Sequence, residues 1–438
     1  PPEIQPWTRI NIIEASAKDP ATAYVAANRY QLDDFRPYLY RTHDFGKTWT
    51  LAVNGIPQDT FVRTVRQDPA SPQLLFAGTE TGVYVSFNDG DSWQSLQMNL
   101  PIVPVTDLTL KNGDLLASTQ GRAFWVLDDV TPLEQLAGAP SSIQLFKPRP
   151  AYRAARGRSF GPPSAFDGVV VDYYLAGAPN GPVKLDFLDA AGKLIKSFSS
   201  EKRADDSRAQ RGRFGAAMAR GDVVPAQAGF NRFVWDMRYA DAEGIDGGTY
   251  LFGGSLRGPE VAPGQYSVRL TAGDRTQTQT IEIRKDPRVP TTQQDYQRQV
   301  AFLLAVRDKL SAANQAINRL LKAQQDVQAT LKSASLNSAA GEKARKLNAD
   351  VETELQQLYE PRFTGFDDQT LIYPLKLNNR IAALQSYVGG DYPPTQQATE
   401  VLDELSRELD GILSHVKQTV DTDLPALHSQ LRSTAAAQ

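Results

Sequence analysis

Two short segments of this chain share one pattern, and the spacing between them restricts the possible fold more than any other feature. Segments 42–49 and 86–93 both read Ser/Thr-x-Asp/Asn-x-Gly-x-Ser/Thr-Trp and begin 44 positions apart. A repeat of about 40–45 residues is typical of one four-stranded blade of a β-propeller. The spacing therefore predicts successive sheets with one such turn each. The matching positions are Thr42, Asp44, Gly46, Thr48 and Trp49 in the first segment, and Ser86, Asn88, Gly90, Ser92 and Trp93 in the second.

The residue types of this pattern are those of a hairpin turn. A small hydroxyl ends a strand, the Asp or Asn side chain bonds to turn amides, and Gly takes a positive φ. The Trp then packs beneath the turn as the next strand begins. We therefore interpret Asp44 and Asn88 as turn residues and not as catalytic ones. A degraded third copy ends in Asp128-Asp129, where the pattern would fall.

Composition changes along the chain and divides it into three predicted domains. Residues 1–137 read as short strands that close two to three propeller blades. Residues 138–287 have strand spacing that suits an immunoglobulin- or fibronectin type III-like β-sandwich. Residues 288–438 have apolar residues at helical spacing and predict an antiparallel bundle of four helices. The predicted fold class is therefore multidomain β plus α, with a mobile surface loop near 199–221.

The boundaries of the helices have local signals. Thr292 and Asp295 form a capping box that starts the first helix, and a second is expected over about 341–359. A third is expected over about 371–388, where Pro374 would kink the helix or delay its start. The fourth begins after Thr395 and carries a seam of Leu402, Leu405, Leu409, Ile412, Val416 and Val420.

Composition also excludes several kinds of site. The chain has no Cys and 3 His among 438 residues, which excludes thiolate chemistry and disfavours a His-rich metal centre. Its net charge of −3 does not suit a general nucleic-acid binder. No phosphate-binding loop occurs, and no apolar run is long enough to span a membrane. We therefore predict no metal, no cofactor, no nucleic-acid partner and no transmembrane segment.

The repeated segments resemble the Asp-box, or BNR repeat, of sialidase-like and sortilin-type β-propellers. Segment 121–129 is also similar to the closing strand of the propeller in large exported bacterial proteins labelled sortilin-like or glycosyl hydrolase. Segments 233–236 and 263–266 are similar to motifs in the sandwich that follows it there. The resemblance implies the C-terminal part of such a protein, exported to the periplasm or the cell exterior. Members commonly have His where this chain has Gln120.

Two to three blades cannot close a propeller, because each blade buries its faces only against its neighbours. We therefore expect an N-terminal propeller portion as a partner, either as a cleaved fragment or as a separate chain. Further protein partners are compatible with the same surfaces.

Two functions from different classes fit these features. The favoured one is a binding or scaffold role, in which the propeller recognises a protein, peptide or glycan and this chain has no complete catalytic site. The alternative is part of a sialidase- or glucanase-like glycoside hydrolase whose catalytic acids lie mainly in N-terminal blades. The weak catalytic candidates here are Asp33, Asp34, Asp128 and Asp129. Adjacent residues on a strand point to opposite faces, so neither pair can flank one glycosidic bond alone.

Overall fold

The computed structural model describes residues 4–136, 142–154, 168–201, 223–248, 251, 253–333, 339–363 and 369–436. The loop expected near 199–221 falls mostly outside these residues. The chain groups into two compact units. One comprises Pro1–Arg149, Asp172–Ala178 and Gln227–Asn231, and the other comprises Pro150–Val171, Pro179–Ala226 and Arg232–Gln438. The domain boundaries expected at 137 and 287 stay predictions.

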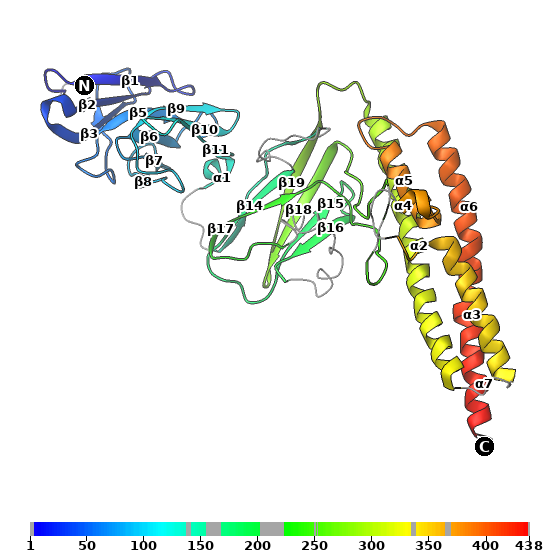
Figure 1. The fold of residues 1–438 in the computed structure, drawn as a ribbon. Helices are drawn as coiled ribbons and strands as arrows, with labels where there is room; N and C mark the ends of the chain where they lie inside the picture. Colours follow the sequence, from blue (N-terminus) through cyan, green and yellow to red (C-terminus); the bar gives the residue numbers. More distant parts are fainter. Residues whose placement is uncertain are drawn as a thin grey trace. The chain divides into compact units, whose positions relative to one another are not determined.

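The first unit begins with three antiparallel sheets that follow one another in sequence (Figure 1). Two of them have four strands, and the fourth strand of each is a two-residue edge strand. It follows one of the repeated segments, 42–49 or 86–93, which we call the box turns. A single helical turn, α1 (Thr131–Glu134), follows the third sheet. The strands are β1 (Arg9–Ala15), β2 (Ala23–Arg29), β3 (Asp34–Thr42), β4 (Thr50–Leu51), β5 (Val62–Gln67), β6 (Leu75–Thr79), β7 (Val83–Ser86), β8 (Gln94–Ser95), β9 (Val105–Lys111), β10 (Asp114–Thr119) and β11 (Phe124–Leu127).

The middle sheet, β5–β8, is buried on both faces. Leu75 and Ala77 of β6 pack with Leu39 of the first sheet, whereas Phe76 packs with Val105 and other residues of the third sheet. This alternation is the period of two that a strand imposes on its side chains. Every residue of β6 is buried. The three sheets therefore form a face-to-face stack, in the manner of adjacent blades.

Each outer sheet has an edge strand without buried residues, whereas β2 of the first sheet is buried on both faces. No residue of β1 or of β11 is buried. Ile13 of β1 is 66% exposed, and Phe124 and Val126 of β11 are 80% and 51% exposed. Both ends of the stack therefore present apolar side chains to solvent.

Two further sheets follow the stack. One has the strand order β13-β19-β18-β15-β16 and the other has the order β12-β14-β17. Aromatic rings join them: Phe187 stacks on Trp235 with centroids 4.3 Å apart, and Phe198 lies 4.8 Å from Phe233. An immunoglobulin or fibronectin type III topology for these layers stays a prediction. The strands are β12 (Ile143–Leu145), β13 (Ala151–Arg153), β14 (Val169–Leu175), β15 (Val183–Leu188), β16 (Leu194–Ser199), β17 (Gly229–Trp235), β18 (Gly264–Ala272) and β19 (Arg275–Lys285).

The C-terminal part is helical, and its long helices run alongside one another (Figure 1). The capping box at its start is present, because Thr292 N donates to Asp295 Oδ2 and Asp295 N donates to Thr292 Oγ1, each at 3.2 Å. The predicted seam of the last helix is buried from Leu402 to Val416. The helices are α2 (Gln293–Ser333), α3 (Ala339–Leu358), α4 (Gln369–Ile372), α5 (Leu377–Tyr387), α6 (Gln396–Gln418), a π-helical turn (Thr419–Asp423) and α7 (Leu424–Ala436).

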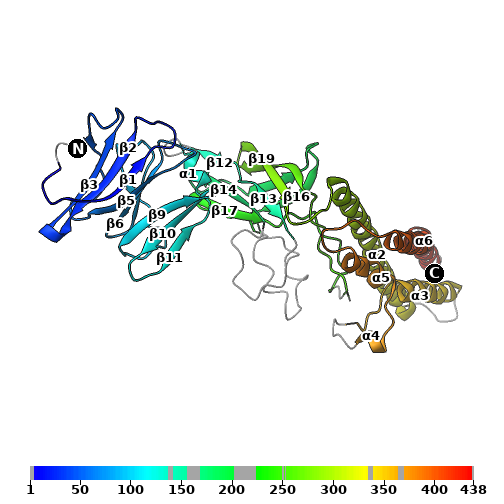
Figure 2. The ribbon, with the colours of Figure 1, turned by 90° about the horizontal axis from the view of Figure 1, so that it is seen from above.

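The third helix was expected over 371–388 with Pro374 kinking it or delaying its start, and its start is delayed to Leu377. The expected range is divided into α4 and α5, and Pro374 lies in the gap between them. Proline has no amide to donate and disfavours helical geometry in the residue before it, so the two segments separate here. Figure 2 shows α4 projecting from the side of the bundle.

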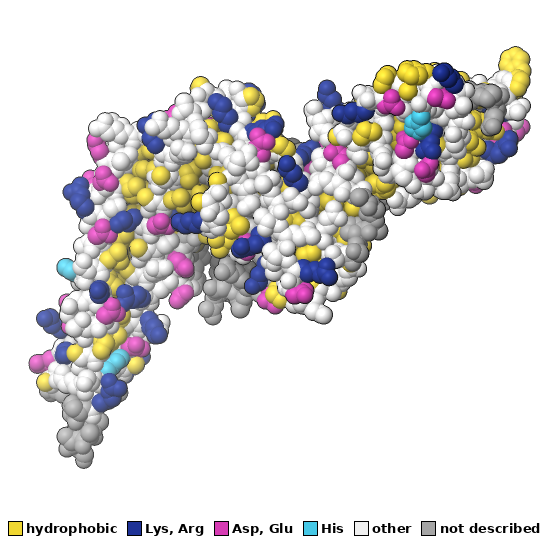
Figure 3. Space-filling view, turned by 180° about the vertical axis from the view of Figure 1, so that it is seen from behind, with side chains coloured by type: hydrophobic (Ala, Val, Ile, Leu, Met, Phe, Trp, Pro, Cys, Tyr) yellow, Lys and Arg dark blue, Asp and Glu magenta, His cyan; other side chains and the backbone are white. Residues whose placement is uncertain are grey.

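The described helices include none that is long and apolar enough to cross a bilayer. Basic and acidic side chains are interspersed over the face of the molecule seen in Figure 3, with no continuous basic area.

Glu354 of α3 is a buried acid inside the bundle, beside the π-helical turn. Thr419 Oγ1 donates to its Oε1 at 2.9 Å, while its Oε2 is buried with no hydrogen-bond partner among the described residues. Burial raises the pKa of Glu354 above its usual value of 4.5, against the opposing effects of Thr419 and His415. Asp350 and Asp423 raise it further. The folded state therefore binds this proton more tightly than the unfolded state does.

We expect Glu354→Gln to stabilise the bundle at pH 7 by about 1 kcal/mol, because a neutral amide replaces a buried carboxylate. The stability that the wild type gains from a protonated Glu354 is fully present below the pKa of this residue in the unfolded state. It is lost as the pH rises through the pKa of Glu354 in the folded state. The difference between variant and wild type should therefore shrink toward pH 4. Urea unfolding followed by helical circular dichroism at pH 4 and pH 7 measures it. Glu352→Gln, on the exposed side of α3, is the control; equal effects of the two changes would contradict the prediction.

Candidate functional site

The first box turn is closed by its own side chains. Thr42 Oγ1 donates to Asp44 Oδ1 at 2.9 Å and accepts from Gly46 N at 3.0 Å. Asp44 also accepts from Thr48 N at 2.8 Å and from Thr48 Oγ1 at 2.6 Å. These bonds, led by that of the Thr48 hydroxyl, lower the pKa of Asp44 to about 2. Gly46 has φ of 80°, the left-handed conformation the turn requires.

The second box makes the same bonds with an uncharged side chain. Ser86 Oγ donates to Asn88 Oδ1 at 3.0 Å and accepts from Gly90 N at 2.8 Å. Asn88 Oδ1 accepts from Ser92 N at 3.0 Å, and Asn88 Nδ2 donates to Ser92 Oγ at 2.9 Å. Because Asn supports this geometry as well as Asp does, the turn needs an acceptor oxygen and not a charge.

The tryptophans of the two boxes make different contacts. Trp49 donates its indole N–H to Gly46 O of its own turn at 3.0 Å. Trp93 donates instead to Ala52 O at 2.9 Å, and its backbone amide donates to Asn54 O at 2.8 Å. Trp93 therefore joins the second sheet to the segment that leaves the first sheet. The motif is the same in both repeats, but only the second Trp serves as an interface residue.

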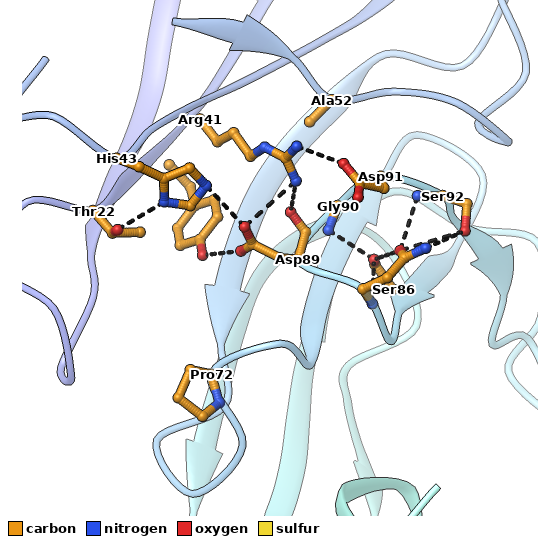
Figure 4. A network of polar contacts seen from close by, with 12 residues as sticks. Thr22, Arg41, His43, Ala52, Pro72, Ser86, Asp89, Gly90, Asp91 and Ser92 are labelled. Atoms are coloured by element: carbon orange, nitrogen blue, oxygen red, sulfur yellow. Dashed lines mark hydrogen bonds and ion pairs between the residues drawn. The ribbon is translucent and has the colours of Figure 1, made fainter. Parts of the chain in front are cut away.

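Asp89, at a variable position of the second box, is the centre of a polar network between the first two sheets (Figure 4). The buried Tyr24 donates its hydroxyl to Asp89, and His43 Nε2 lies 2.9 Å from Asp89 Oδ2. Arg41 Nη1 donates to Asp89 O at 2.5 Å, and Arg41 Nη2 donates to Asp91 Oδ1 at 2.5 Å. Burial, followed by the bond to Asp89, raises the pKa of Tyr24 well above its usual range. These contacts fix the second box against the strands of the first sheet.

His43 lies at a variable position of the first box, and its ring is half-exposed. Both of its ring nitrogens are nevertheless engaged, because Nδ1 lies 2.8 Å from Thr22 Oγ1. The order Thr22–His43–Asp89 imitates the nucleophile, base and acid of a hydrolase triad. Thr22 is only 5% exposed, however, and it donates its hydroxyl to Asp19 at 2.6 Å. Because that proton is committed to Asp19, the arrangement holds the blades together and does not form a nucleophile.

Asp33 and Asp34 follow the short 3₁₀ turn at Tyr30–Leu32. Asp33 is exposed and has φ of 59°. Asp34 accepts two bonds from Arg36 at 2.9 Å and one from Tyr38 Oη at 2.7 Å. The Arg36 guanidinium therefore holds the pKa of Asp34 well below its usual range. A carboxylate held ionised in this way cannot serve as a general acid.

Asp128 and Asp129 follow β11 at the end of the third sheet. Asp129 is buried and accepts from Thr131 N at 3.2 Å and from Thr131 Oγ1 at 2.6 Å, which shapes the start of α1. Its other oxygen lies 3.9 Å from Arg149 Nε. Asp128 is partly exposed. Among the described residues no hydrogen bond or ion pair connects this pair with Asp33 or Asp34, so the predicted acids do not assemble into one site.

A cavity that the sequence did not indicate lies in the second unit. It has a volume of about 620 Å³ and is lined by residues from four separate segments. Arg153 lies at its base, 5% exposed, and donates to Val261 O at 3.1 Å and to Gln299 Oε1 at 2.5 Å. Asp391 Oδ1 lies 3.8 Å from Arg153 Nε. The described residues contain no group of three or more His, Cys, Asp or Glu that could hold a metal.

No protein-family model and no curated protein matches this chain. Among solved structures, an ancestral GH74 enzyme is similar at 15% identity over 44% of this chain and 27% of its own, with a TM-score of 0.23. YCF48 bound to D1 peptide is similar at 14% identity over 44% of this chain and 54% of its own, with a TM-score of 0.20. A GH74 enzyme of Niastella koreensis is similar at 13% identity over 63% of this chain and 46% of its own, with a TM-score of 0.23. The chain thus spans between about a quarter and about half of these structures. The architecture described above rests on strand pairing and packing, not on these similarities.

Proposed function

We propose that this chain is a binding and scaffold portion of a larger exported β-propeller protein that recognises a protein, peptide or glycan. The observation that carries the proposal is the three-sheet stack, whose edge strands β1 and β11 have no buried residue. Blades are stable when neighbours cover them, so a stack of this kind is a part of a longer array. The box turns and the Asp89 network then serve to hold adjacent blades in a fixed order.

The partner in this proposal is an N-terminal propeller portion, present as a cleaved fragment or as a separate chain. It would cover the faces that expose Ile13 at one end and Phe124 and Val126 at the other. These side chains are apolar, so they favour the apolar face of another sheet over a charged partner. Burying them against a further sheet would remove the cost of exposing them to water.

A glycoside hydrolase is the alternative, and its catalytic acids would lie mainly in the partner blades. Such an enzyme needs one carboxyl to protonate the leaving group and a second to act as base or nucleophile. Asp34 is held ionised by Arg36, and Asp129 is engaged by Thr131. Binding is therefore the better supported function for this chain.

Size-exclusion chromatography and native mass spectrometry of the full chain test the proposal. We expect self-association through the uncovered sheet faces, and we expect Phe124→Ser to reduce it. Leu194→Ser, which changes an exposed apolar residue of β16, is the matched control and should leave association unchanged. A stable, monodisperse monomer would overturn the proposal. Chromogenic glycosides should not be hydrolysed by this chain, and turnover by it would favour the hydrolase alternative.

A further inference from the structure

The cavity of the second unit is held open by a fixed loop. Gly254 packs so closely on α5 that a Cβ added there would lie 2.3 Å from Ala382 O. The next residue, Ser255, donates from its amide and its hydroxyl to Gln385 Oε1 at 3.1 and 3.3 Å. Together these contacts fasten the loop between β17 and β18 to the end of α5. The cavity lies between two segments that cannot separate without losing both contacts.

Three side chains around this cavity have hydrogen-bond donors that are not engaged. Gln385 uses its Oε1 for Ser255, which leaves its Nε2 without a partner among the described residues. Arg257 uses Nη2 for Asp236 at 2.9 Å, which leaves Nε and Nη1. Ser386 lines the cavity with an exposed hydroxyl that has no side-chain bond to another described residue. Amide and guanidinium nitrogens can only donate, so the ligand that satisfies them must supply acceptors.

Both acids of the cavity face an arginine, although Asp391 Oδ2 has no hydrogen-bond partner among the described residues. Glu260 accepts from Arg238 Nη2 at 2.8 Å and lies 3.7 Å from Arg153 Nε. Asp391 faces the same Arg153. The lining has three arginines and two acids, and Asp236 pairs with Arg257 from outside the lining, so each arginine faces a carboxylate. Arg257, whose side chain is 51% exposed, is the most exposed of the three. An anion entering the cavity would bind through the nitrogens of Arg257 that Asp236 does not engage.

We propose that this cavity binds a small polar molecule through an oxyanion, either a carboxylate or a phosphate. Charge-assisted bonds from Arg257, with neutral bonds from Gln385 and Ser386, would hold the anionic group. The volume of about 620 Å³ falls within the ordinary range for small-ligand sites. The proposal is independent of the propeller, because every residue in it belongs to the second unit.

Isothermal titration of the full chain with glucuronate, inorganic phosphate and glucose at low ionic strength tests this site. We expect at least one of the two anions to bind with a millimolar dissociation constant, and we expect glucose not to bind. Which anion binds more tightly assigns the carboxylate or the phosphate as the natural group. Absence of binding by both anions, or binding of glucose as tight as that of glucuronate, overturns the proposal.

Two variants separate a specific site from general attraction. Gln385→Glu keeps the oxygen that accepts from Ser255 but replaces the free donor by a negative oxygen, and we expect it to weaken anion binding at least tenfold. Arg257→Ala should weaken it about five- to tenfold by removing a cation. Arg284→Ala, which removes an exposed arginine of β19 outside the cavity, should change nothing. Unchanged affinity in both cavity variants, with unchanged circular dichroism, would also overturn the proposal.

Discussion

Replacing Trp93 by Ala is expected to lower the free energy of unfolding of the first unit by about 3–5 kcal/mol. The side chain is 5% exposed and packs with Ala52, Ile56 and Leu75 between the first two sheets. Its removal leaves a cavity at that interface and leaves Ala52 O without the bond it accepts at 2.9 Å. Native-state hydrogen exchange of the β5–β7 amides measures the loss in this unit separately from the helices.

Trp49→Ala is the matched control, because the residue occupies the same position of the other box. Trp49 is only partly buried and bonds within its own turn, so we expect a cost of about 1–2 kcal/mol. Equal losses in the two variants would show that both tryptophans act locally. That result would contradict the role of Trp93 in joining two sheets.

Replacing Arg153 by Met is expected to destabilise the second unit by about 3–5 kcal/mol, because it leaves buried polar groups without their cation. Arg153 is the point where the sheets meet the helices. Its guanidinium lies 4.6 Å from the centre of the Tyr296 ring and bonds to Gln299 of α2. Asp391, which follows α5, is only 7% exposed and faces the same guanidinium. Thermal unfolding followed by helical circular dichroism measures the effect.

A double variant isolates the uncompensated charge. Arg153→Met with Asp391→Asn removes both charges, and we expect it to recover at least about 1 kcal/mol of the loss. Arg284→Met, at an exposed ion pair, should cost much less than Arg153→Met, because solvent screens the pair. If the double variant were no more stable than Arg153→Met, the loss would come from packing and not from the buried charge.

Local chemistry explains which parts of the fold the sequence could predict. The capping box at Thr292 and the seam of α6 depend on residues three or four positions apart, and both are present. The bonds of the box turns likewise lie within seven residues. Pro374 lies between α4 and α5, so the delay that this residue predicts in the start of the third helix is present.

The Asp89 network and the cavity of the second unit depend on residues far apart in the chain. Asp89 occupies a position that the box pattern leaves unspecified, and its partners come from β2, β3 and the first box. The only signal in the sequence was the pairing of cations in one box with acids in the other. The cavity around Arg153 and Arg257 had no such signal, because packing of the helices on the sheets creates it. Tertiary contacts of this kind have no fixed spacing and leave no periodic pattern.

The middle sheet of the stack also determines how this part of the molecule comes apart. Each outer sheet contacts one neighbour, whereas β5–β8 contacts two, so disruption should begin at the ends and move inward. In such a stack each sheet is stabilised by the sheets directly beside it. A sheet added at an end therefore gives the previous end sheet a second neighbour. The sheet that contains Trp93 would then be the last to unfold. Each sheet added at an end of the stack would protect the sheet beneath it from local unfolding.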